Sequence, residues 1–80
     1  MAYYFYIIPS EMDSSFYVGT TNNLIDRIAR HNQGRSKYTN SRCPWHLVYH
    51  EKYPDRPSAM KRKYAIKRKK SRGYIEAFFP

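Results

Sequence analysis

The stretch that decides the fold is FYVGTTNNLIDRIARHN, residues 16–32. Its first residues are aromatic and β-branched, which is typical of a strand, and we predict that this strand spans residues 15–20. Polar residues follow, and then Leu24, Ile28 and His31 recur at the spacing of one helix face. The stretch therefore predicts a strand that leads directly into a helix.

The residues at the two ends of this helix predict where it begins and stops. Asn23 is a suitable N-cap, and Asp26 lies three residues later in the capping-box position, near the positive end of the helix dipole. Gly34, directly after Gln33, can adopt the left-handed conformation that closes a helix. We therefore expect the helix to lie between Asn23 and Gln33.

The flanking sequence predicts a small sheet with helices packed on it. YYFYII at residues 3–8 is a strand that a five-residue polar loop joins to the next strand as a hairpin. WHLVY, from Trp45, begins a third strand, Ser58 is a candidate cap for a second helix, and GYIEAFF at residues 73–79 fits a short third helix. The apolar stripe of the second helix is Ala59, Met60, Tyr64 and Ile66. The order β-β-α-β-α-α predicts an α/β fold with helices layered on a sheet.

Length and charge limit the function classes. Eighty residues form one domain, residues 1–80. No apolar run reaches the ~20 residues of a membrane-spanning helix, and residues 1–10 lack signal-peptide features, so we expect a soluble, cytoplasmic protein with no membrane partner. The single cysteine, Cys43, excludes an internal disulfide. Fifteen Lys and Arg against six Asp and Glu give a net charge of +9, which favours nucleic acid as the partner.

Two basic clusters are candidate nucleic-acid contacts, one after the first predicted helix and one in and after the second. The candidates are Arg35, Lys37, Tyr38, Arg42, Lys61, Lys67, Arg68 and Lys70. Basic side chains interleaved with an aromatic ring suit single-stranded or distorted DNA, and phosphate contacts predict weak sequence preference and steep salt dependence. The alternatives are a solvated helix end, a nuclear-localisation patch and a small basic RNA-associated protein.

Four polar side chains are expected to converge beside the first helix. Arg27 and His31 are four residues apart, so they share a helix face. Tyr17 lies on the strand before this helix, and strand alternation can place Tyr6 of the partner strand on the same face. Gly19 allows another backbone or a ligand to approach closely. An arginine holds phosphate oxygens and a phenolate or imidazole accepts a proton from water, so the set suits a phosphodiester. Each residue alone has an ordinary explanation in packing or solvation.

The same residues resemble the GIY-YIG nuclease superfamily, and most closely its small stand-alone members related to the N-terminal nuclease domain of the bacterial excinuclease. Tyr4-Phe5-Tyr6 stands where the first tyrosine motif lies, YVG at residues 17–19 is the second motif, and the family arginine corresponds to Arg27. The similarity continues through His31-Asn32, Gly34, KYT at 37–39, PWHLVYHEKY at 44–53 and RPSAMKR at 56–62. It spans residues 3–78.

The resemblance implies a three-stranded antiparallel sheet flanked by helices, and one-step hydrolysis of DNA, single-stranded or branched, with one Mg²⁺ or Mn²⁺. It implies that Tyr6 and Tyr17 are paired phenols, of which one acts as or assists the general base. Because a free tyrosine has a pKa of about 10, that phenol needs a lowered pKa. It also implies that Arg27 stabilises the phosphorane charge and that His31 orients a tyrosine or relays its proton.

Lys63 departs from the family, because it stands where a metal-binding glutamate is expected within AMKRKYAIK at residues 59–67. It also lies inside the predicted apolar stripe, where an ionisable group is costly without a function. An ammonium repels a divalent cation, and Glu51, Asp55 and Glu76 are no obvious substitutes. Three interpretations remain open: a charge-reversed form of an active nuclease, a relative that binds DNA without cleaving it, or a slow metal-independent reaction that uses the lysine charge.

Overall fold

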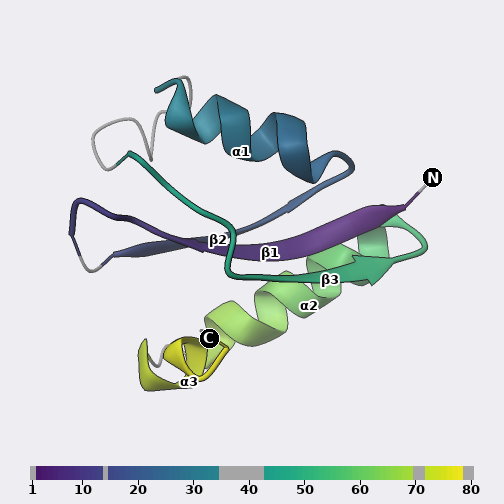
Figure 1. Cartoon of the computed structure of the whole chain (residues 1–80). Helices are drawn as coiled ribbons and strands as arrows, with labels where there is room; N and C mark the ends of the chain where they lie inside the picture. The colour runs from purple at the N-terminus through teal and green to yellow at the C-terminus, as the bar shows by residue number, and fades with distance from the viewer. Residues whose placement is uncertain (1, 14, 35–42, 70–71, 79–80) are drawn as a thin grey trace.

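The computed structural model describes residues 2–13, 15–34, 43–69 and 72–78. Within them the elements are β1 (Tyr3–Pro9), β2 (Phe16–Thr21), α1 (Leu24–Asn32), β3 (Tyr49–Tyr53), α2 (Arg56–Arg68) and α3 (Arg72–Glu76). The predicted order β-β-α-β-α-α is confirmed (Figure 1). The three strands form one antiparallel sheet in the order β2-β1-β3, so β2 is an edge strand.

The two faces of the sheet carry different layers, with α1 on one face and α2 and α3 on the other (Figure 1). Alternate residues of each strand point to opposite faces, and both faces are apolar. The core on the α2 side consists of Phe5, Ile7, Val18, Ile66 and Ile75. The core on the α1 side consists of Tyr6, Ile8 and Trp45, with Tyr17, Leu24, Ile28 and Cys43 packed against it. Among the described residues, no helix combines the length and apolar character needed to cross a bilayer.

The ends of α1 follow the local sequence closely. The Asp26 backbone N–H donates to the Asn23 side chain at 3.1 Å, which satisfies one of the unpaired donors of the first turn. Gly34 follows the C-cap Gln33 with a φ of 74°, the left-handed conformation that glycine adopts without strain. The predicted beginning and end of α1 are confirmed.

The predicted cap of α2 is wrong by three residues. Asp55, not Ser58, is the N-cap, and its carboxylate accepts from the Ser58 backbone N–H at 2.9 Å. The helix therefore begins at Arg56 and contains Pro57 in its first turn, where a missing N–H has no consequence.

The third strand also begins later than predicted. Trp45 is buried and forms an isolated bridge with Ser10, whereas the regular ladder of β3 begins at Tyr49. The Asn32 side chain donates to the Trp45 carbonyl at 2.9 Å and accepts from its N–H at 2.5 Å. The Asn32 side chain thus holds the Trp45 backbone at the C-terminal end of α1, and the segment before Tyr49 pairs with the sheet only at isolated points.

The predicted apolar stripe of α2 is partly confirmed. Ala59 and Ile66 are buried, but Tyr64 is 53% exposed, so its predicted place in the stripe is wrong. Arg62 lies on the sheet side of α2 instead, and its guanidinium lies about 6 Å from the ring centroids of Phe5 and Phe78.

Arg62 fixes α2 to β3 through a carboxylate. Its Nε and Nη2 donate to Glu51 at 2.9 and 3.1 Å, and the phenols of Tyr49 and Tyr53 donate to the same group. Burial raises the pKa of Glu51, but hydrogen bonds from Arg62 and the two phenols outweigh it and hold the pKa below its usual range. This carboxylate therefore stabilises the packing of α2 on the sheet.

Candidate functional site

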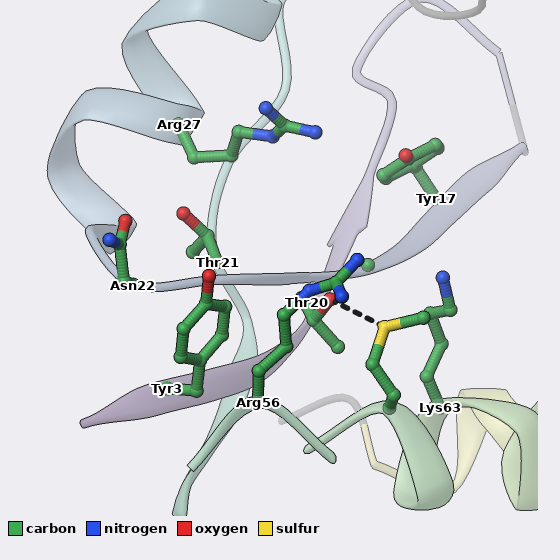
Figure 2. A pocket seen from close by; sticks show the side chains of 10 residues that line it. Tyr3, Tyr17, Thr20, Thr21, Asn22, Arg27, Arg56 and Lys63 are labelled. Atoms are coloured by element: carbon green, nitrogen blue, oxygen red, sulfur yellow. Dashed lines mark hydrogen bonds between the residues drawn. The ribbon is translucent and has the colours of Figure 1, made fainter. Parts of the chain in front are cut away.

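A pocket of about 300 Å³ lies along the β2 edge of the sheet, between α1 and α2 (Figure 2). Its lining residues are Tyr3, Tyr17, Gly19, Thr20, Thr21, Asn22, Arg27, Arg56, Met60 and Lys63. The structure thus brings three of the predicted site residues, Tyr17, Arg27 and Lys63, to one pocket. Arg27 reaches it from α1, and Lys63 reaches it from α2 (Figure 2).

The other two predicted residues, Tyr6 and His31, lie behind this pocket and do not line it. Their exposed fractions are 0% and 1%, and the Tyr6 hydroxyl lies 3.0 Å from His31 Nε2. The Tyr17 ring packs against both, with its centroid 4.8 Å from that of His31 and 6.2 Å from that of Tyr6. The predicted set is therefore arranged in two layers, with Tyr17 between the pocket and the buried pair.

The buried pair has an electrostatic character that the sequence did not predict. Desolvation raises the pKa of Tyr6 to about 12, although Arg27 partly opposes it. The lowered pKa expected of a general base is therefore not found at Tyr6. Burial, together with the Arg27 charge, lowers the pKa of His31 to about 4. At neutral pH a protonated phenol thus faces a neutral imidazole, which suits donation from the Tyr6 hydroxyl to Nε2.

Gly19 makes the close packing of the two tyrosines sterically feasible. A Cβ at this position would lie 2.6 Å from the Tyr6 hydroxyl oxygen and 2.8 Å from Tyr17 Cε1. Gly19 pairs with Tyr6 across the β1–β2 ladder, so the missing side chain leaves room for both rings. The close approach that the sequence predicted here is made by two side chains of the protein itself.

Arg27 lines the pocket and carries one buried donor without a partner in the described part of the chain. Its Nε is buried and has no hydrogen-bond partner among the described residues. Hydrogen bonding to the Tyr6 phenol is the main cause that raises the pKa of Arg27, so the guanidinium is charged and tied to the buried pair. A forked donor held in this way can bind phosphate oxygens.

Lys63 is a half-buried cation among other cations. Burial lowers the pKa of Lys63, and the charges of Lys67 and Arg56 lower it further. Its ammonium lies 5.1 Å from the ring centroid of Tyr64, which provides a weak cation–π contact. Lys63 therefore brings a positive charge to the pocket.

The lining does not fit a divalent metal ion. It contains no carboxylate, and no group of three His, Cys, Asp or Glu is placed to hold a metal, within the residues that the structure describes. Mg²⁺ and Mn²⁺ prefer oxygen ligands, with carboxylates foremost. The acids considered as substitutes have other partners: Glu51 binds Arg62, Asp55 caps α2, and Glu76 pairs with Arg72.

Six lining residues were not predicted for this site: Tyr3, Thr20, Thr21, Asn22, Arg56 and Met60. Tyr3 resembled an ordinary packing residue in an aromatic strand. Arg56 could have been found, because Arg56, Met60 and Lys63 are spaced by four and three residues and so share one helix face.

The predicted basic clusters are described only in part. Lys61, Lys67 and Arg68 are exposed on α2, and none of the three lines the pocket. The remaining candidates, Arg35, Lys37, Tyr38, Arg42 and Lys70, lie outside the described residues.

The family profile of the GIY-YIG catalytic domain matches residues 2–75. The chain belongs to the GIY-YIG family. It is 47% identical over 68 residues to a UPF0213 protein of Lactiplantibacillus plantarum, covering 81% of this chain and 66% of that protein. It is 42% identical over 78 residues to a UPF0213 protein of Bacillus pumilus, covering 92% and 79%.

A solved structure supports the fold assignment. The solution NMR structure of a UPF0213 protein from Bacillus halodurans is 36% identical, with a TM-score of 0.59, and the match covers 96% of this chain and 81% of that chain. The predicted family and the predicted three-stranded antiparallel sheet with flanking helices are both confirmed. GIY-YIG nucleases generally depend on a metal ion, whereas the described lining of this pocket is cationic and holds no carboxylate.

Proposed function

We propose that this chain binds DNA, holds a phosphodiester in the pocket, and cleaves it poorly because Lys63 replaces the metal-binding carboxylate. One observation carries the proposal: Tyr17, Arg27 and Lys63 share a pocket with Arg56, and no carboxylate of the described residues lines it.

Binding follows from the charges at and around the pocket. Arg27 can hold two phosphate oxygens with its forked donors, while Arg56 and Lys63 attract the same group from α2. The exposed cations of α2 and the net charge of +9 extend this attraction to neighbouring phosphates. Contacts of this kind release counterions, so affinity should fall steeply with salt.

The hydrolytic part of the site is retained except for the carboxylate. Tyr17 is the phenol at the pocket, so it is the candidate to act as or assist the general base. Tyr6 and His31 hold its ring from behind and so act as positioning residues, and Arg27 would stabilise charge on the phosphorane. A divalent ion would activate water and neutralise charge, and the lining of this chain does not fit one.

The test compares this chain with Lys63→Glu on labelled single-stranded, branched and duplex DNA, each with Mg²⁺, Mn²⁺ or EDTA. We expect this chain to bind without appreciable cleavage and Lys63→Glu to gain cleavage that EDTA abolishes. Lys61→Glu is the matched control, because it makes the same charge change at an exposed position of α2 and should gain nothing. Adding Tyr17→Phe or Arg27→Ala to Lys63→Glu should remove the gained cleavage.

Two results would contradict parts of this proposal. Metal-dependent cleavage by the unmodified chain at the rate of Lys63→Glu would show that Lys63 does not suppress hydrolysis. Absence of cleavage in both proteins, with tight and salt-dependent binding, would favour the second function, a non-catalytic nucleic-acid-binding module on the same fold. That second function is favoured by the cationic lining itself. Circular dichroism of every variant verifies that the fold is retained.

A further inference from the structure

The charge balance of the pocket differs from that of a metal-assisted site. Three cationic side chains line it, Arg27 from α1 and Arg56 and Lys63 from α2, and no carboxylate in the described part of the chain joins them (Figure 2). In a metal-assisted phosphoryl site, carboxylates hold the cation and cancel part of its charge. Here no described group in the lining cancels the three positive charges. A lining of this kind repels a metal ion and attracts an anion.

The pocket also supplies directional donors. Arg27 lines the pocket with a guanidinium whose terminal N–H groups form a fork of donors. The phenols of Tyr3 and Tyr17 line the same space. A tetrahedral oxyanion can accept from several such donors at once.

Lys63 adds a second reason for an anionic ligand. Its ammonium is half-buried, and Arg56 and Lys67 repel it from the same helix. A bound anion would relieve both the desolvation and the repulsion, and it would do so in proportion to its charge. A phosphodiester carries one negative charge, whereas a phosphomonoester carries about 1.5 to 2 at pH 7.

We propose that the pocket selects a phosphomonoester, such as the terminal phosphate of a DNA strand, and binds it without a metal ion. This inference rests on the proposed DNA binding and adds the chemical class of the preferred ligand. Arg27, Arg56 and Lys63 together recognise the dianion, and Lys63 takes over the charge-neutralising part of the missing ion without its Lewis acidity.

The test uses one single-stranded oligonucleotide in three forms, with a 5′-phosphate, with a 3′-phosphate, or with hydroxyls at both ends. Each carries an internal fluorophore, and binding to the full chain is measured by anisotropy in EDTA. We expect about tenfold tighter binding for at least one phosphorylated form, as one added charge beside three cations predicts. Inorganic phosphate and a mononucleotide serve as competitors, and they distinguish a free phosphomonoester from a strand end as the better ligand.

Three variants localise the effect. Lys63→Gln and Arg56→Gln should each reduce the ratio between phosphorylated and hydroxyl-ended DNA to nearly one. Lys52→Gln is the matched control, because Lys52 is exposed on β3, does not line the pocket, and loses the same charge. It should lower the affinity for all three oligonucleotides equally and leave the ratio unchanged.

The outcomes separate this inference from the proposed function. Equal affinity for all three oligonucleotides would overturn the inference and leave DNA binding intact. A ratio that persists in both Lys63→Gln and Arg56→Gln, or that appears only with Mg²⁺, would also overturn it. Failure to bind any of the three would refute the proposed function as well.

Discussion

The buried imidazole of His31 makes the stability of this protein depend on pH in a range where its carboxylates change little. The ring is 1% exposed, and burial together with the Arg27 charge lowers its pKa to about 4, from an ordinary 6.5. The unfolded chain therefore takes up a proton at this residue as the pH falls below 6.5, while the folded protein does not. The contribution of His31 to the free energy of unfolding is complete above the pKa of the unfolded chain. It is lost as the pH falls towards the pKa of the folded protein.

The size of the effect follows from the two pKa values. Between pH 7.5 and pH 5, protonation stabilises the unfolded chain by about 2 kcal/mol and leaves the folded state almost unchanged. A protein of this length has a free energy of unfolding of about 4–12 kcal/mol, so the loss is a large fraction of the total. The pKa of Glu51 is held below its usual range, so that carboxylate loses its contribution at lower pH.

The assay is urea unfolding followed by far-UV circular dichroism at pH 7.5, 6 and 5. We expect the free energy of unfolding to fall by about 2 kcal/mol across this range, and His50→Gln, at an exposed histidine, to show the same fall. His31→Gln should abolish the pH dependence. NMR of the His31 ring gives an independent measurement, which does not require that variant to fold. Titration of this ring near pH 6.5, or a free energy of unfolding that stays constant from pH 7.5 to 5, would refute the reasoning.

Two further substitutions test the packing around the site. Gly19→Ala should lower the free energy of unfolding by about 1–3 kcal/mol, because its methyl would meet the fully buried Tyr6 at 2.6 Å; a urea midpoint equal to that of the unmodified protein would contradict the close packing. Glu51→Gln should cost about 1–3 kcal/mol, because the partly buried Arg62 guanidinium loses its bidentate acceptor. Thermal unfolding at neutral pH measures this, and an unchanged Tm would show that the ion pair contributes nothing to the fold.

Much of the fold could be predicted because its determinants are local. The polar cap at Asn23 and the glycine at position 34 are enough to set the limits of α1, and the aromatic hairpin strands follow from composition. The third strand could not be placed in the same way. The Asn32 side chain binds the Trp45 backbone, thirteen residues away, just before this strand. The alternation of apolar and polar residues in the sequence does not reveal such a contact.

For the site, the sequence predicted which residues lie near one another but not how deeply each is buried. The spacing of Tyr17 and Arg27, and the family resemblance for Lys63, predicted three residues that the structure gathers at one pocket. It could not show that Tyr6 and His31 lie behind the pocket, because burial depends on how the helix and sheet pack together. The direction of a pKa shift depends on that depth, so it also required the structure.

The attachment of α2 through Arg62 has a consequence for how this scaffold can change. Arg62 and Glu51 set the rotation of the helix about its axis, and they do so from the residue directly before Lys63. The residue that holds α2 on the sheet, Arg62, is thus a different residue from Lys63, which lines the pocket. We therefore expect substitutions at position 63 to change the charge of the pocket while the Arg62–Glu51 ion pair keeps α2 on the sheet.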